Sequence, residues 1–350
     1  MSVKLKRVLC LFISLIIIFG ALSAASIICN HPSEDVENTV DSFYRENENG
    51  LDVVMVGSSA ASKDFQPSIL WNAGNITSYC FAVGACSANI YTSIIDEVLT
   101  KQPDAVILID IDGIVVDDKF QAEEGPIKLW IDSMPKNRNH LNMIKKYFSD
   151  EPGELLFPIL KYHRYMTSLY AYVQISSRLL KKEILDIKDP LGGSTLNNCK
   201  PIKNAVQYYN TETGTEKMTE LSQQVFEELL EYCRDRSIKN MLFVNLPKSS
   251  VEDWQLERNI NYSRRTNYIR KTVAQYGYEV YDYNALGNPA GLDETADFAD
   301  TLHLTTRGAI KFSEYFAGYL NDKYGFSEKN DETALEWNSR YEQAKELMTY

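Results

Sequence analysis

The sequence predicts an α/β fold, a three-layer sandwich around a doubly wound sheet of five parallel strands, preceded by a transmembrane helix. Three observations predict it. Apolar runs rich in Val, Ile and Leu lack polar alternation, which is typical of strands covered on both faces. Segments with helical spacing separate most of these runs, as in right-handed strand–helix–strand units. A long uncharged run lies near the N-terminus.

The N-terminal segment, residues 1–29, has the pattern of a membrane anchor. Lys4, Lys6 and Arg7 precede an uncharged run from Val8 to Cys29, about long enough to cross a hydrocarbon core of ~30 Å. The basic cluster predicts a single-pass protein of the cell membrane, with a cytoplasmic N-terminus and an extracytoplasmic body. A cleaved signal peptide is the alternative, because "GALSAAS" offers small residues for cleavage. A lipoprotein is less favoured, since no small residue precedes Cys29.

The composition limits the classes of molecule that are expected to be the main partner. The 350 residues carry a net charge of −12 and a sequence pI near 5.0, which argues against nucleic acid or anionic headgroups as the main partner. Four cysteines outside the anchor could form two disulfides or remain free and buried, and the sequence leaves both open: Cys80, Cys86, Cys199 and Cys233.

Five strands and four helices account for the predicted flavodoxin-like core, within a domain at 51–326. The strands are expected at 52–57, 78–83, 104–110, 240–246 and 278–283. The helices are marked by apolar or aromatic side chains three or four residues apart, at Ile90–Val98, Met218–Tyr232, Tyr262–Tyr276 and Ala309–Leu320.

The remaining segments surround this core. Residues 30–50 are expected to form a polar linker, and 327–350 a polar helical tail. The stretch at about 120–215 is longer than an ordinary connection, so it is expected to be an inserted subdomain or a lid.

Two short segments carry candidate catalytic residues. Gly57-Ser58-Ser59 ends the first strand, and ligands bind beyond the carboxyl ends of strands in open parallel sheets. A serine nucleophile there needs a base and a group that orients the base. His303 precedes the last helix, and Asp300 lies three residues before it. The alternative interpretation is that Asp300 caps a turn and His303 is a surface residue.

These residues resemble the motifs of the SGNH (GDSL-type) hydrolase superfamily. "VVMVGSSAA" is similar to its first block, which implies that Ser59 is the nucleophile, and "DTLH" is similar to its last block. The chain most resembles a membrane-anchored branch that includes teichoic-acid D-alanyl transfer and alginate O-acetylation proteins. The resemblance spans roughly 51–322, and this branch's terminal pattern is matched at Asp297-Phe298, Asp300, His303, Gly308-Ala309 and Lys311.

The middle blocks of the family are matched less well. The resemblance implies that the Ser59 and Gly84 backbone amides face the oxyanion, although a Gly is also expected at any tight strand–helix turn. The third-block Asn is absent from "VILIDIDGIVVDD", and losing such a donor costs ~3 kcal/mol of transition-state stabilisation. Ser58 either binds substrate or shapes the turn, and the latter is favoured.

The insertion and the acidic loop offer further candidates. His163-Arg164 resembles a His-Arg-aromatic element of this branch, which implies contact with an anionic or polyol substrate; a surface helix is the alternative. Four acidic residues could suggest a divalent metal but are interpreted as solvated loop residues, so neither a metal nor a cofactor is expected: Asp110, Asp112, Asp117 and Asp118.

The expected function is that of an esterase or O-acyltransferase acting through an acyl-serine. Its partners would be an acyl donor or an acylated cell-surface polymer, such as a polysaccharide or teichoic acid, and in addition a multi-pass membrane O-acyltransferase. The alternative is a catalytically reduced domain that binds polysaccharide or scaffolds a membrane acyltransferase. The missing Asn favours this alternative, and the intact set of Ser59, Asp300 and His303 opposes it.

Overall fold

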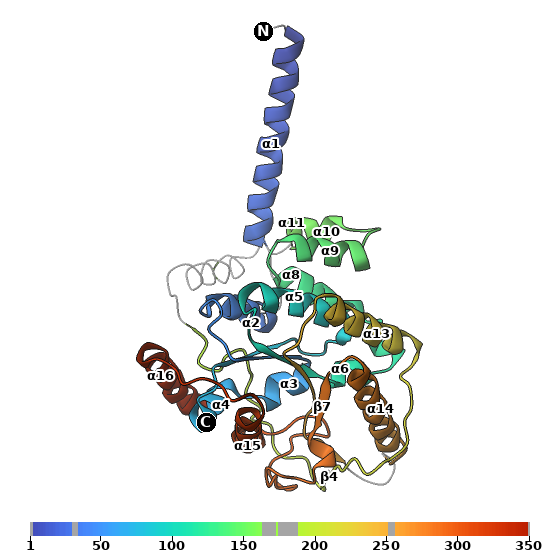
Figure 1. Cartoon of the computed structure of the whole chain (residues 1–350). Helices are drawn as coiled ribbons and strands as arrows, with labels where there is room; N and C mark the ends of the chain where they lie inside the picture. Colours follow the sequence, from blue (N-terminus) through green and yellow to red (C-terminus); the bar gives the residue numbers. More distant parts are fainter. Residues whose placement is uncertain (1–2, 30–33, 163–172, 174–187, 251–255, 349–350) are drawn as a thin grey trace. The chain divides into compact units, whose positions relative to one another are not determined.

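The computed structural model describes residues 3–29, 34–162, 173, 188–250 and 256–348 (Figure 1). Its strands are β1 (Val53–Gly57), β2 (Ser78–Ala82), β3 (Val106–Asp110), β4 (Val206–Gln207), β5 (Met241–Asn245), β6 (Ser249–Ser250) and β7 (Glu279–Asp282). Its helices are α1 (Val3–Cys29), α2 (Glu34–Arg45), α3 (Ser59–Asp64), α4 (Pro67–Gly74), η1 (Ala88–Ile90), α5 (Tyr91–Lys101), α6 (Asp112–Val115), α7 (Asp118–Gln121), α8 (Glu124–Ser133), α9 (Arg138–Tyr147), α10 (Gly153–Leu156), α11 (Pro158–Tyr162), α13 (Glu220–Asp235), α14 (Leu256–Gln275), η4 (Tyr283–Ala285), α15 (Thr306–Tyr324) and α16 (Asp331–Met348).

The chain divides into two compact units. One comprises residues 38–127 and 187–350 and holds the sheet; the other comprises residues 1–37 and 128–186 and holds α1 with α9, α10 and α11. The segment that separates from the sheet unit, 128–186, is shorter than the insertion expected at about 120–215. Residues 188–215 belong to the sheet unit and supply β4.

The sheet unit is built on five parallel strands in the order β2-β1-β3-β5-β7. Every neighbouring pair in this sheet is parallel, and Val53 of β1 lies between Ser78 of β2 and Val106 of β3. The α/β class and the five predicted parallel strands are confirmed. The chain first moves to one side of β1 and then crosses to the other, which brings the carboxyl ends of β1 and β3 together at the reversal point.

Alternate side chains of each strand face different helix layers. Val53 and Met55 of β1 belong to a buried cluster with side chains of α3, α4 and α15. Helices α5, α13 and α14 cover the opposite face, where Phe243 of β5 meets Phe226 of α13. Burial on both faces explains why the strand sequences are almost continuously apolar.

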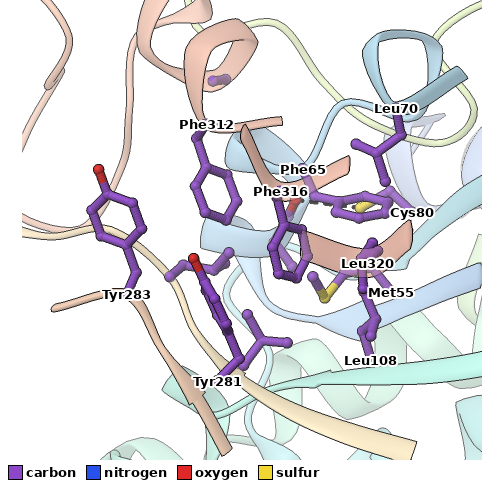
Figure 2. Close-up of a cluster of buried hydrophobic side chains, with 14 of the residues drawn as sticks. Met55, Phe65, Leu70, Cys80, Leu108, Tyr281, Tyr283, Phe312, Phe316 and Leu320 are labelled. Atoms are coloured by element: carbon purple, nitrogen blue, oxygen red, sulfur yellow. Dashed lines mark hydrogen bonds between the residues drawn. The ribbon is translucent and has the colours of Figure 1, made fainter. Parts of the chain in front are cut away.

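Aromatic side chains of α15 fill much of the space between this helix and the sheet, on the face that also carries α3 and α4 (Figure 2). Phe312 stacks on Phe316 at 5.2 Å between ring centroids, and Phe316 lies 4.9 Å from Tyr281 of β7. Burying a Phe side chain contributes about 1.5–3 kcal/mol, so this helix is held firmly against the sheet. The residues just before α15, which include His303, are therefore fixed in place relative to β1.

The C-terminal helix α16 is packed against the sheet unit. Trp337 is 3% exposed and lies 5.9 Å from Trp71 of α4 between ring centroids. Arg340 donates two hydrogen bonds to the Glu46 carboxylate, at 2.8 and 2.9 Å, and both residues are buried. The tail that the sequence marks as a polar helix thus contributes to the core of this unit.

Within the described residues, the cysteines Cys10, Cys80, Cys86, Cys199 and Cys233 are free. Cys80 and Cys86 are buried, and their thiols donate to the carbonyl oxygens of Ala61 and Gly57 at 3.3 Å. Of the two options left open by the sequence, the structure shows free and buried cysteines at Cys80, Cys86 and Cys233, whereas Cys199 is free and exposed.

Among the described helices, one is long and apolar enough to cross a membrane. It is Val3–Ser23 of α1, with a mean hydropathy of 2.3 over its most apolar window, none of which is buried. This agrees with the N-terminal apolar helix predicted from the sequence.

Candidate active site

Ser59 lies at the start of α3, directly after β1. Gly57 ends the strand, and Ser58 is extended, with φ −97° and ψ −161°. A Cβ added at Gly57 would lie 2.6 Å from the Cβ atoms of both Ala61 and Asp110, which is closer than van der Waals contact. Glycine is therefore required because α3 and β3 approach the strand end too closely for a side chain.

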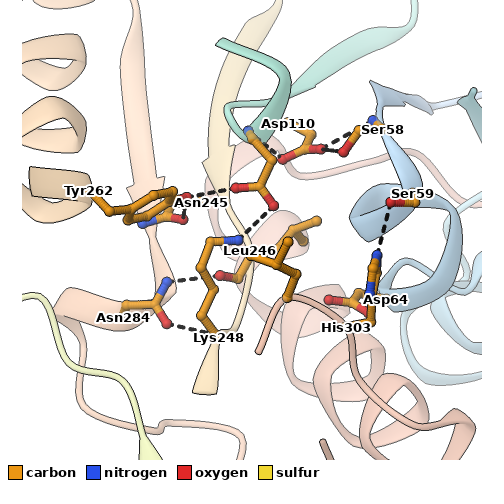
Figure 3. A network of polar contacts seen from close by, with 12 residues as sticks. Ser58, Ser59, Asp64, Asp110, Asn245, Leu246, Lys248, Tyr262, Asn284 and His303 are labelled. Carbon is orange, nitrogen blue, oxygen red and sulfur yellow. Dashed lines mark hydrogen bonds and ion pairs between the residues drawn. The ribbon is translucent and has the colours of Figure 1, made fainter. Parts of the chain in front are cut away.

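Asp110, at the carboxyl end of β3, holds this turn (Figure 3). Its Oδ2 accepts hydrogen bonds from the backbone N–H of Ser58 at 3.2 Å and from the Ser58 hydroxyl at 2.8 Å. Its Oδ1 accepts from the backbone N–H of Asp112 at 2.9 Å. The hydroxyl of Ser58 is thus engaged with β3, which supports the turn-shaping role favoured from the sequence.

The loop before α15 presents His303. Phe298 and Leu304 form an isolated antiparallel bridge, and the N–H of Ala299 donates to the carbonyl of His303 at 2.9 Å. Inside this loop, Oδ1 of Asp300 accepts from the backbone N–H groups of Leu302 and His303 at 2.8 and 2.9 Å. The carboxylate therefore closes its own turn and stays beside the imidazole three residues later.

Ser59, His303 and Asp300 form a continuous hydrogen-bonded chain. Ser59 Oγ lies 2.9 Å from His303 Nε2, and His303 Nδ1 lies 2.8 Å from Asp300 Oδ2 and 2.9 Å from Oδ1. A carboxylate next to Nδ1 favours the proton on that nitrogen, which leaves the lone pair of Nε2 directed at the serine hydroxyl. The two segments that the sequence singled out lie together in space, 244 residues apart in the chain.

The charge of Asp300 is favoured by its hydrogen bonds. Burial alone would raise the pKa of this half-exposed carboxyl, but the hydrogen bond from the His303 side chain and that from Leu302 N–H outweigh burial and lower the pKa below its ordinary value. Asp300 is thus an ionised acceptor, as an orienting group requires.

Asp64 links the serine helix to the histidine loop. It ends α3, is fully buried, and accepts a hydrogen bond from the backbone N–H of Leu304 at 2.9 Å. Burial raises its pKa well above the ordinary value, because an ionised carboxylate would be poorly solvated there. This contact fixes the residue after His303 to the helix that begins with Ser59.

A second polar network lies at the carboxyl ends of β3, β5 and β7 (Figure 3). Asp112 forms an ion pair with Lys248 at 2.6 Å and accepts from the hydroxyl of Tyr262 at 2.7 Å. The same hydroxyl lies 2.7 Å from Oδ1 of Asn245, whose Nδ2 donates to Asp282. The network thus ties α6, α14 and the two last strands of the sheet together.

The segment after β5 also supports the histidine loop. Ser249 donates its backbone N–H to the carbonyl of Thr301 at 3.2 Å and its hydroxyl to the carbonyl of Asp300 at 3.0 Å. Lys248, immediately before it, is 4% exposed. The catalytic candidates are therefore supported from α3 on one side and from the β5–β6 segment on the other.

The acidic residues after β3 are placed differently from the expectation of a solvated loop. Asp110 is fully buried. Its burial and, to a smaller extent, the charge of the neighbouring Asp112 raise its pKa to about 7. Asp117 caps α7 through the N–H of Phe120, and Asp118 accepts from the N–H groups of Leu221 and Ser222. The interpretation as solvated residues was wrong for Asp110 because it overlooked the unpaired donors of the neighbouring serine turn.

Among the described residues, no group of three or more His, Cys, Asp or Glu could hold a metal ion.

Two further candidates from the sequence are Gly84 and the pair His163-Arg164, and the structure describes only Gly84. Gly84 is exposed and lies two residues beyond β2, and the preceding Val83 donates its N–H to the carbonyl of Gly57 at 3.0 Å. Gly84 is thus beside the serine turn, where a backbone donor was predicted. His163 and Arg164 lie outside the described residues.

Sequence reasoning missed Asp64 and Lys248 as parts of this site. No signal in the sequence marks Asp64, because "SAASKD" is mostly polar and an acidic residue there could equally be solvated. Lys248 lies in "NLPKSS" directly after a predicted strand, where parallel sheets place functional side chains.

In comparisons with known proteins, no protein-family model and no curated protein matches this chain.

Proposed function

We propose that this protein is a membrane-anchored, extracytoplasmic esterase or O-acyltransferase of the SGNH type that works through an acyl-serine. The observation that carries the proposal is the hydrogen-bonded chain from Ser59 through His303 to Asp300, with heavy-atom distances of 2.8–2.9 Å. A serine is inert at its free pKa and needs such a base to act as nucleophile. The resemblance of the two flanking motifs to the family blocks supports the same assignment.

In the first step, Ser59 Oγ attacks the carbonyl carbon of an ester while Nε2 of His303 accepts the hydroxyl proton. The Oγ–C bond forms, and the carbonyl π electrons move to the oxygen. When the tetrahedral intermediate collapses, the ester C–O bond breaks, and His303 gives its proton to the leaving alcohol. Asp300 stabilises the imidazolium through Nδ1.

In the second step, water or a hydroxyl of a sugar or polyol attacks the acyl-serine, and His303 accepts its proton. The Oγ–C bond then breaks, and the proton returns to Ser59. Water as acceptor gives hydrolysis, and a polymer hydroxyl gives acyl transfer. The side chain of Asp300 is 49% exposed and Ser59 is half-buried, which supports access of a polymer to the proposed site.

Stabilisation of the oxyanion is where this site departs from the family. The proposed donors are the backbone amides of Ser59 and Gly84, and the third-block Asn is missing. The buried carboxyl of Asp110 is hydrogen-bonded to Ser58, the residue before the nucleophile, and would oppose negative charge there when ionised. Burial and the neighbouring Asp112 raise the pKa of Asp110, which favours its neutral form and reduces that opposition.

The substrate class follows from the anchor and from the resemblance. A catalytic unit tethered by α1 next to the cell surface meets polymers such as teichoic acids or acylated polysaccharides, and an acyl donor supplied by a multi-pass membrane O-acyltransferase. Under this proposal no cofactor takes part, because the serine supplies the covalent step.

A second candidate function is favoured by one observation. The missing Asn, together with an acidic side chain beside the serine turn, is the pattern expected of a domain that has lost turnover and retains binding. Such a domain would bind polysaccharide or scaffold a membrane acyltransferase. In that case turnover of a small ester would not depend on Ser59.

The experiment that separates the two is hydrolysis of p-nitrophenyl acetate by the detergent-solubilised full chain. We expect Ser59→Ala to lose turnover by about 10³-fold or more, as triads do when the nucleophile is removed. Ser327→Ala, an exposed serine in the loop between α15 and α16, is the matched control and should retain turnover. Equal turnover in the wild type and Ser59→Ala would support the binding function instead.

A further inference from the structure

The unit formed by residues 1–37 and 128–186 contains a short apolar element beside the anchor. It consists of α10 and α11, and its sequence "GELLFPILKY" carries five large apolar side chains. Leu156, which ends α10, and Leu160 of α11 are 40% and 52% exposed. Transfer of such exposed apolar side chains from water into an apolar environment is favourable.

The contact that this element makes with α1 indicates which environment it meets. Helix α11 packs against α1 (Figure 1). The ring of Phe157 lies edge-on to that of Phe19, with centroids 5.9 Å apart. Phe19 lies in the uncharged run Val8–Cys29, ten residues before its end. At 1.5 Å per residue this is about 15 Å along the helix, so Phe19 is within the hydrocarbon if α1 crosses the membrane.

The end of α1 at which this contact occurs is also informative. Lys4, Lys6 and Arg7 precede the run, so α11 contacts the half of the run that lies farther from the basic cluster. If α1 crosses the membrane with this cluster in the cytoplasm, the contact lies in the exported half of the bilayer. The exposed Leu156 and Leu160 then meet acyl chains rather than water.

The charges around this element suit a membrane surface. Residues 128–162 carry six Lys or Arg and four Asp or Glu, a net charge of +2, in a chain whose net charge is −12; three of the acidic residues, Asp150, Glu151 and Glu154, lie directly before or within α10. Lys145 and Lys146, in the last turn of α9, are exposed. Basic side chains near apolar ones are typical of segments that lie in the interface and meet anionic headgroups.

We propose that α10 and α11 form a membrane-inserted wedge on the exported side of the anchor, with Leu156 and Leu160 in the acyl-chain region. The proposal rests on the membrane anchor of the proposed function and is independent of the acyl-serine chemistry. It gives the protein a second point of contact with the bilayer, so that this unit is held at the membrane and does not swing freely on α1.

The test uses the full chain in nanodiscs of phosphatidylcholine and phosphatidylglycerol. Nitroxides are placed on single cysteines at positions 156 and 160, with position 17 as the lipid reference and position 347 of α16 as the water reference. Ile17 lies in the uncharged run and is 64% exposed. Leu347 is 46% exposed in the sheet unit, comparable to the two test positions. Cys10, Cys29 and Cys199 are replaced by Ser, and the buried Cys80, Cys86 and Cys233 remain.

Collision with oxygen, which dissolves in acyl chains, is compared with collision with a water-soluble nickel chelate. We expect positions 156, 160 and 17 to collide more with oxygen, and position 347 more with nickel. If positions 156 and 160 behave like position 347 while position 17 behaves as in lipid, the wedge is overturned and the anchor stands. Protection of positions 156 and 160 from both reagents would indicate a protein partner and would also overturn the wedge. If position 17 also behaves like position 347, the anchor and the wedge both fail.

Discussion

Asp110 accepts two hydrogen bonds from Ser58, one from the backbone N–H and one from the hydroxyl, although the two residues are 52 positions apart. This pairing joins the ends of β1 and β3 directly before Ser59. It also places a titratable carboxyl in a fully buried position beside the candidate nucleophile.

The first prediction concerns stability against pH. Burial and the charge of Asp112 raise the pKa of Asp110 to about 7, so between about pH 4 and pH 7 the folded protein binds a proton that the unfolded chain releases. The contribution of Asp110 to the free energy of unfolding therefore falls as pH rises through this range. Asp110→Asn should flatten that fall, measured as the unfolding midpoint of the solubilised chain at several pH values. Asp235→Asn, at a surface position, is the control, and parallel curves for Asp110→Asn and the wild type would disprove the prediction.

The second prediction concerns the catalytic chain. Because Ser59 and His303 act as one unit, the double variant Ser59→Ala/His303→Ala should lose no more ester turnover than either single variant. Asp300→Asn should lose less than either, since its contribution is orientation and charge at Nδ1. Rates with p-nitrophenyl acetate check both statements. Additive losses would mean that the two residues act separately.

The third prediction concerns Asp64. Asp64→Leu leaves the buried N–H of Leu304 without its acceptor, which costs about 1–3 kcal/mol of stability and loosens the histidine loop. Asp64→Asn keeps an acceptor oxygen and should retain most of the activity. The pair of variants is compared by thermal unfolding and by ester turnover. Equal behaviour of the two would show that this hydrogen bond does not position His303.

The fourth prediction concerns the strand end. Gly57→Ala places a Cβ 2.6 Å from Ala61 and Asp110, so the backbone must shift, at a cost of roughly 1–3 kcal/mol. Gly84→Ala is the matched variant at the neighbouring strand end, where a Cβ meets nothing within 4 Å, and its stability should change by less than about 0.5 kcal/mol. Unfolding midpoints of the two variants test the difference, and an unchanged midpoint for Gly57→Ala would contradict it.

The strands were predictable because one physical requirement sets their sequence. Val53–Gly57 and Val106–Asp110 are buried on both faces, which leaves continuous apolar runs that are visible without any structure. Ser59 and His303 were predictable because strand ends and helix starts in such a sheet lie at one edge. The role of α16 was hidden, because the contacts of Arg340 with Glu46 join residues 294 positions apart.

The polar surroundings of the site were less predictable for a similar reason. The sequence around Asp110 would look the same whether its carboxylate is solvated, binds a metal or accepts a hydrogen bond from Ser58. Only the register of β3 against β1 determines which of these contacts it makes. Lys248 and Asp112 are likewise paired across 136 positions. Local patterns carry no information about such distant partners.

The central claim is that Ser59 is the nucleophile, and covalent trapping tests it most directly. The full chain is treated with a fluorophosphonate, digested, and the modified residue is located by mass spectrometry. The account predicts a phosphonyl group on Ser59, no adduct in Ser59→Ala, and slow labelling in His303→Ala, because the base that activates the hydroxyl is removed. An unlabelled Ser59 in a folded wild-type chain, or an adduct on another residue that persists in Ser59→Ala, would contradict it.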